Sequence, residues 1–157
     1  MSNIRGIKLG IVEVSQERRG ESHSQLHTLL ETRKETLSLF NQLAEMRPFK
    51  PDRESQLMLQ EFCEAIVDYT ASAHFQLYRF IDDGTERRTE ISSLSAKVYP
   101  QISDMTKVIL AFNEKYDCSD QCNNLAELAD DLSQLGEVLA DRIVLEDQLI
   151  NLFMGAR

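Results

Sequence analysis

Apolar residues recur every three or four positions along four long segments of the chain, which is the spacing of one face of an α-helix. This spacing predicts four helices, over about residues 22–46, 52–81, 85–116 and 123–154. Pro48 and Pro51 separate the first two segments, and Gly84 follows the second. Pro100 predicts a kink or a break near Tyr99 in the third. Short connections make neighbouring helices antiparallel, so the sequence predicts an all-α fold, an elongated antiparallel four-helix bundle.

The same spacing predicts which side chains of the first three helices point inward. In the first helix these are Leu26, Leu30, Leu37, Phe40 and Ala44. In the second they are Met58, Phe62, Ile66, Tyr69, Ala73, Leu77 and Phe80. In the third they are Ile91, Leu94, Val98, Ile102, Met105, Ile109, Phe112 and Tyr116.

The apolar face of the fourth helix is interrupted by two opposite charges. Leu128, Leu132, Leu135 and Leu139 follow one another in steps of three and four, and the next two positions of that face are Arg142 and Glu146. Apolar spacing then resumes at Leu149 and Phe153, so the helix continues through the charged pair. Two interpretations remain open, a buried structural ion pair and a polar cavity for a partner. Truncating one member of a buried pair costs about 3–5 kcal/mol.

Length and charge limit the classes of protein. The chain of 157 residues fits one domain, which we expect to be the bundle at residues 22–157, preceded by an N-terminal arm at residues 1–21. A net charge of −9 disfavours direct binding to nucleic acid and favours a basic protein partner. The sequence has no run of 18 apolar residues, and its beginning is too charged for a signal peptide. We therefore expect a cytoplasmic protein without a membrane segment.

The residues that could carry chemistry are few. Cys118 and Cys122 have C-x3-C spacing but no nearby histidine or second cysteine pair to complete a zinc site. The histidines are His23, His27 and His74, whose positions fit neither a carboxylate-bridged iron bundle nor a multi-histidine site. No catalytic motif is visible. We expect no enzyme activity, no cofactor and no bound metal, and a metal-binding bundle is kept as a minor alternative.

Two blocks of sequence resemble a known family. Residues 62–69 read FCEAIVDY and residues 70–75 read TASAHF, while residues 135–137 read LGE and residues 141–150 read DRIVLEDQLI. These blocks are similar to the signatures of the Rsd/AlgQ family of bacterial anti-sigma factors, with weaker similarity at residues 98–102 and 111–113. The resemblance spans about residues 25–155. The chain departs from the family pattern in having no tryptophan, with Leu29 and Leu30 before Arg33, and in placing Ala71 before Ser72.

The resemblance implies an anti-sigma factor that binds the C-terminal, fourth conserved region of the major sigma factor. Such a protein blocks the contacts of sigma with core RNA polymerase and promoter DNA, and we expect a monomer that binds one sigma. The family residues that transfer to this chain are Asp68, Tyr69, His74, Phe75, Arg142, Glu146 and Asp147. Asp68, Ser72 and Phe75 share one helical stripe, which would face Arg142 and Glu146 and form a cavity for an apolar anchor of sigma. The alternative is a helical adaptor that binds another regulatory protein.

Overall fold

The protein is built from long helices, and the computed structural model describes residues 11–78, 89–117 and 125–155, with side chains over 26–78, 93–117 and 125–152. The elements are α2 (Ile11–Ala44), α3 (Arg53–Ala73), the π-helical turn η1 (His74–Tyr78), α5 (Thr89–Tyr116) and α6 (Leu125–Gly155). The described residues contain no strand. The predicted all-α fold is therefore confirmed.

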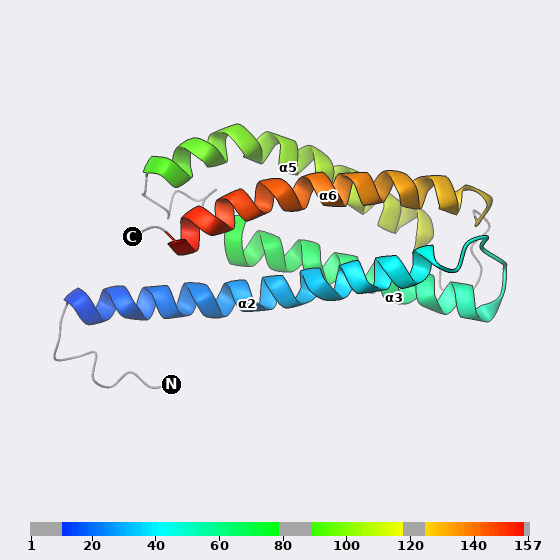
Figure 1. Ribbon diagram of the computed structural model, residues 1–157, viewed down its shortest axis with the longest axis horizontal. Helices are drawn as coiled ribbons and strands as arrows, with labels where there is room; N and C mark the ends of the chain where they lie inside the picture. The colour runs from blue at the N-terminus through cyan, green and yellow to red at the C-terminus, as the bar shows by residue number, and fades with distance from the viewer. Residues whose placement is uncertain (1–10, 79–88, 118–124, 156–157) are drawn as a thin grey trace.

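The four long helices form an elongated bundle in which neighbours in sequence run in opposite directions (Figure 1). α2 packs along α3 and α5 packs along α6, while further contacts join α3 to α5 and α2 to α6. The first turns of α2 extend beyond the C-terminal end of α6 (Figure 1). The core lies between the four helices over the rest of their length.

The helices differ from the predictions at two places. α2 begins at Ile11, so the start predicted at Ser22 is wrong, and part of the expected arm is helix. A kink or a break is predicted near Tyr99; α5 continues through Pro100 without a break, and its N-terminal half is bowed in Figure 1. The start of α3 agrees closely with the sequence, because the Asp52 side chain caps it by accepting a hydrogen bond of 2.8 Å from the backbone N–H of Ser55.

The buried faces of α3, α5 and α6 agree with the predicted spacing, and that of α2 does not fully agree. Val98, Ile102, Ile109, Phe112 and Tyr116 are buried on α5, as are Leu128, Leu132, Leu135, Leu139, Arg142, Glu146 and Leu149 on α6. On α2 the buried side chains are Leu26, Leu29, Thr36 and Leu43, whereas Leu37 is exposed. The side chains of Phe80, Ile91 and Phe153, which are predicted to point inward, lie outside the ranges over which side chains are described.

Candidate functional site

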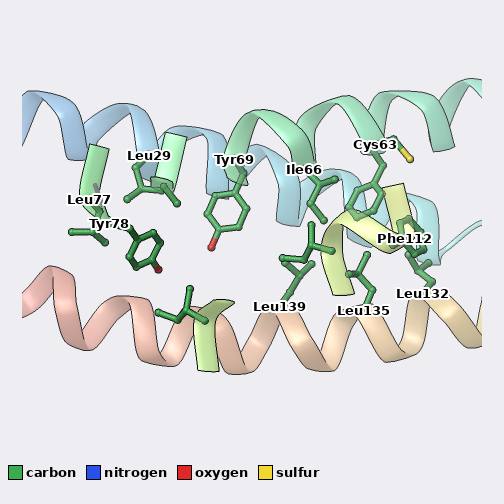
Figure 2. Close-up of a cluster of buried hydrophobic side chains, with 14 of the residues drawn as sticks. Leu29, Cys63, Ile66, Tyr69, Leu77, Tyr78, Phe112, Leu132, Leu135 and Leu139 are labelled. Carbon is green, nitrogen blue, oxygen red and sulfur yellow. The ribbon is translucent and has the colours of Figure 1, made fainter. Parts of the chain in front are cut away.

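Glu146 of α6 lies at the centre of a buried polar cluster in the middle of the bundle. Its carboxylate is fully buried. Oε1 accepts hydrogen bonds from the Tyr69 hydroxyl at 2.7 Å and from Arg33 Nη1 at 3.2 Å, and Oε2 accepts one from the Tyr78 hydroxyl at 2.8 Å. Figure 2 shows the two tyrosine rings directed from α3 and η1 toward α6. The carboxylate is thus held by α2, α3 and η1 together.

The π-helical turn explains how two tyrosines nine positions apart reach the same carboxylate. In a regular α-helix each residue rotates by about 100°, so positions 69 and 78 would lie on opposite sides. η1 covers residues 74–78 and has wider turns, which changes the register at its end. Leu77 and Tyr78 are both buried as a result. Such π turns occur frequently at functional sites.

Arg142 lies one turn before Glu146 and is 1% exposed. Its Nη1 donates a hydrogen bond of 2.6 Å to Thr106 Oγ1 on α5, and its guanidinium carbon lies 5.4 Å from the Tyr69 ring centroid and 5.6 Å from that of Tyr78. Its Nε is 3.7 Å from Glu146 Oε2, too far for a hydrogen bond, and is buried without a partner among the described residues. Arg142 is therefore held by packing as much as by its ion pair.

Arg33 of α2 links the buried carboxylate to the surface. Its Nη1 contacts Glu146 Oε1 and also lies 2.8 Å from Asp147 Oδ1. The Asp147 side chain is 47% exposed, so the cluster runs from the core to solvent along this ion pair. Desolvation lowers the pKa of Arg33, but the hydrogen bonds and charges of Asp147 and Glu146 raise it by more.

The environment keeps both tyrosine hydroxyls protonated. Burial raises the pKa of Tyr69 and of Tyr78, and the negative charge of Glu146 raises both further. Burial also lowers the pKa of Arg142, but its interactions with Tyr69, Tyr78 and Glu146 raise it by more. The cluster therefore combines cationic guanidinium groups with neutral phenol donors arranged around one carboxyl group.

A cleft of about 170 Å³ opens beside Arg142 between α3, η1 and α5. Its lining includes Thr70, His74, Tyr99, Thr106 and Lys107 together with the Arg142 guanidinium. The Tyr78 ring, which also lines the cleft, packs against Tyr99 with ring centroids 6.4 Å apart. The cleft thus borders the polar cluster at Arg142 and Tyr78.

The structure separates the predicted site residues into two groups. Tyr69, Arg142 and Glu146 are buried and contact one another. Asp68, His74 and Phe75 are exposed, Ser72 is partly buried, and Asp147 lies at the edge of the cluster.

The predicted stripe of Asp68, Ser72 and Phe75 does not face Arg142 and Glu146. Tyr69 is the residue that α3 directs toward Glu146, and Asp68, one position earlier, is rotated by about 100° into solvent. Phe75 is 56% exposed, with its ring edge-to-face against His74 at 4.9 Å between centroids. The prediction of a cavity between these residues and the ion pair is therefore wrong.

The cluster also contains Arg33, Tyr78 and Thr106, which are not among the site residues predicted from the sequence. Arg33 could have been found, because Leu26, Leu29, Arg33 and Thr36 repeat on α2 the pattern that revealed Arg142 and Glu146 on α6. Thr106 lies one turn after the buried Ile102 on α5, but nothing in that spacing pairs it with Arg142. Tyr78 becomes inward-facing only through the π turn, for which the sequence gives no signal.

Two further findings concern metal binding and membrane insertion. Within residues 11–78, 89–117 and 125–155, no group of three histidine, cysteine, aspartate or glutamate side chains is placed to bind a metal ion. Cys118 and Cys122 lie outside the described residues. Over those same ranges, none of the helices combines the length and the apolar character needed to cross a membrane.

Comparison with known proteins identifies the class. Residues 9–154 match the family model described as "Regulator of RNA polymerase sigma(70) subunit, Rsd/AlgQ", and the chain belongs to this family. It is 32% identical to the "Regulator of sigma D" of Yersinia enterocolitica over 146 residues, covering 90% of this chain and 87% of that protein. It is 32% identical to the protein of the same name from Salmonella typhi over 154 residues, covering 94% and 93%. No solved structure matches the chain.

Proposed function

We propose that this protein is an anti-sigma factor that binds the C-terminal, fourth conserved region of the major sigma factor and blocks its contacts with core RNA polymerase and promoter DNA. The observation that carries the proposal is the match to the sigma(70) regulator family over residues 9–154, nearly the whole chain. The protein acts by occupying a surface of sigma, which lowers the concentration of free sigma by mass action. It functions in the cytoplasm as a monomer that binds one sigma, and it needs neither cofactor nor direct contact with nucleic acid.

The contact surface that we favour is the exposed α3 face, defined as Glu64, Val67, Asp68, Ala71, His74 and Phe75. All six side chains are exposed and recur every three or four positions. Two of them, Val67 and Phe75, are apolar and 38% and 56% exposed, and the carboxylates of Glu64 and Asp68 lie beside them. A partly apolar surface with acidic neighbours is suited to a basic DNA-binding domain.

Phe75 is the expected centre of this contact. Its ring is the largest exposed aromatic group among the described side chains, and His74 supports one edge of it. Aromatic side chains that become fully buried in an interface commonly contribute 2 kcal/mol or more to the binding free energy, about a 30-fold change in Kd. The net charge of −9 steers the basic partner toward the surface without supplying specificity.

The buried cluster supports this surface and takes no direct part in binding. Tyr69 and Tyr78 flank the exposed residues 74 and 75 in sequence, and their hydrogen bonds to Glu146 fix the end of α3 and η1 against α6. The cluster therefore determines which side chains of residues 74–78 remain outside.

Calorimetric titration of the full chain with the isolated C-terminal domain of the major sigma factor tests the proposal. We expect a 1:1 complex whose Kd rises about 30-fold in Phe75→Ala and about 3- to 10-fold in Asp68→Asn at low salt. Val144→Ala is the matched control, because Val144 is 58% exposed on α6 and should leave Kd unchanged.

Two results would contradict parts of the proposal. The absence of a complex at low salt would reject the anti-sigma function and favour an adaptor for another protein. A complex with unchanged affinity in both Phe75→Ala and Asp68→Asn would retain sigma as the partner and move the contact away from the α3 face.

A further inference from the structure

The cleft beside Arg142 has the features of a ligand site that the binding of sigma does not require. It lies between α3, η1 and α5 and has only His74 in common with the exposed α3 face. Its volume of about 170 Å³ is close to that of the cavity of about 150 Å³ known to hold one benzene molecule in another protein. The cleft is therefore large enough for a small organic molecule.

Arg142 is incompletely neutralised at the floor of the cleft. Glu146, its nearest carboxylate, already accepts hydrogen bonds from Tyr69, Tyr78 and Arg33. One buried carboxylate is thus shared by two guanidinium groups, and the second acid, Asp147, pairs with Arg33 on the side toward solvent. A buried polar group without a complete set of partners is costly, and a ligand that accepts hydrogen bonds would relieve that cost.

Further donors surround the mouth of the cleft. Lys107 Nζ is 3.9 Å from Asp104 Oδ1, a long contact between two side chains that are 77% and 79% exposed, so its charge remains available to a ligand. Ser103 and Tyr99 add hydroxyl groups, and the His74 ring adds a nitrogen. Asp104 pairs with Lys107 only at this long distance, and Glu146 already accepts three hydrogen bonds. The donors and positive charges therefore outnumber the free acceptors.

Part of the cleft lining is apolar. It is formed by Ile102 and by the rings of Tyr78 and Tyr99, whose planes meet at 63°. The hydroxyls of Thr70 and Thr106 already donate to the backbone carbonyls of Ile66 and Ile102, at 2.7 and 2.8 Å, and so offer acceptors only. An occupant should present an anionic group to Arg142 and Lys107 and an apolar or aromatic body to the rings.

We propose that this cleft binds a small organic anion, a phosphate or a carboxylate carried on an apolar or aromatic body. The anionic group accepts from Lys107, Ser103 and the Arg142 guanidinium, and the body packs on Tyr99, Tyr78 and Ile102. The site shares only His74 with the proposed sigma contact, and binding of a small anion can be tested on the protein alone.

Titration of the ¹⁵N-labelled full chain with phenyl phosphate, benzoate and phenol, followed by NMR, tests the proposal. We expect both anions to shift the amide signals of residues 99–107 and 70–78 with a Kd on the order of 1 mM, ordinary for fragments of this size. Phenol lacks the charge and should bind at least tenfold more weakly. Equal affinity for phenol and the two anions, or no shift with either anion, would overturn the proposal.

Two variants and a control locate the site. Lys107→Met should raise the Kd of phenyl phosphate about 5- to 10-fold, since it removes one cation at the mouth. Lys97→Met is the control, because Lys97 is an exposed lysine about 15 Å away along the same helix, and it should change nothing. Ser103→Phe should abolish binding of every probe by filling the cleft, and the circular dichroism spectrum checks that this variant folds. Unchanged binding in Lys107→Met and Ser103→Phe would place the ligand elsewhere and reject the site.

Discussion

The inward face of α6 has two halves that are equally buried and chemically opposite. From Leu128 to Leu139 it presents four leucines, and from Arg142 to Glu146 it presents two charges, with every one of these side chains at most 2% exposed. The leucine half needs only apolar neighbours, which tolerate small shifts of one helix along another. The charged half needs Arg33, Tyr69, Tyr78 and Thr106 at fixed positions on α2, α3, η1 and α5.

This difference shows how burial acts on the two halves. Packing in the leucine half is non-directional, and its contribution is roughly proportional to the apolar area removed from water. In the charged half, burial penalises each group, and hydrogen bonds with defined geometry repay that cost. The leucine half therefore supplies free energy of folding, and the charged half restricts the bundle to one register. That register leaves His74 and Phe75 outside.

Glu146→Ala, in the charged half, is the substitution with the largest expected effect on stability. The substitution removes the acceptor of three hydrogen bonds and leaves two buried hydroxyls and the Arg142 charge without it. We expect the free energy of unfolding, measured by urea titration, to fall by about 3–5 kcal/mol. Glu137→Ala, at an exposed position of the same helix, is the control and should have little effect. A loss below about 1 kcal/mol for Glu146→Ala would mean that the charged half contributes no more than a surface ion pair.

Gly136→Ala is the corresponding test in the leucine half. A Cβ at this position would lie 2.7 Å from Phe40 Cζ, closer than side chains approach, so the Phe40 ring or the helices would have to shift. Alanine gains about 1 kcal/mol of helix propensity over glycine, but overpacking costs about 1–3 kcal/mol. We expect a net fall in the free energy of unfolding that is smaller than for Glu146→Ala. Phe40→Leu combined with Gly136→Ala should recover part of it, and a net stabilisation by Gly136→Ala alone would contradict the close contact.

Much of this architecture could be predicted from the sequence, because long amphipathic segments report their own buried face. The charged half was also visible, since Arg142 and Glu146 occupy positions between leucines of the same face. On α2 the apolar spacing predicts Leu30 and Leu37 as inward residues, while the structure buries Leu29 and Thr36. The contact of Arg33 with Glu146 explains why a charged residue lies on the same side of α2 as Leu29 and Thr36.

The direction in which the exposed residues face is harder to predict from the sequence. Asp68 and Phe75 are predicted to face the ion pair, but α3 buries Ile66, Tyr69 and Ala73, as its apolar spacing predicts. Asp68 and Phe75 lie off that face and are exposed. After Ala73 the π turn changes the register, so a constant rotation of about 100° per residue no longer applies. A local change of helix type depends on tertiary contacts such as the Tyr78 hydroxyl with Glu146, and periodicity alone cannot reveal it.

Unfolding at alkaline pH tests how burial in the apolar core affects an ionisable group. Cys63 lies in the apolar core, where burial raises its pKa to about 12, with smaller contributions from Asp117 and Glu64. Because the folded pKa exceeds the unfolded value of about 8.5, the folded state binds more protons above pH 9, so stability falls as the pH rises. This single group lowers the free energy of unfolding by at most about 1.4 kcal/mol per pH unit.

Cys63→Ala isolates that contribution. The variant should lose stability at neutral pH through its cavity, but its free energy of unfolding should decline less steeply between pH 9 and 11 than that of the parent. The remaining slope comes in part from Tyr69 and Tyr78, whose pKa values are also raised by burial and so act in the same direction. Identical slopes in Cys63→Ala and the parent would show that the thiol is not titrated during unfolding in this range.

The smallest effect is expected from Lys115→Met, which tests charges outside the core. Lys115 Nζ lies 2.8 Å from Asp131 Oδ2 and also pairs with Glu127, and these contacts join α5 to α6 near the leucine half. Lys115 and the Tyr116 hydroxyl both donate to Asp131, which lowers the pKa of that carboxyl group. Because the cluster is exposed to solvent, salt screens it, and the difference in Tm between variant and parent should shrink toward zero in 1 M NaCl, where the Debye length is about 3 Å. The loss in Glu146→Ala should persist at the same salt concentration, because a buried pair is screened much less. If both losses persisted, or both disappeared, burial would not be what distinguishes the two ionic clusters.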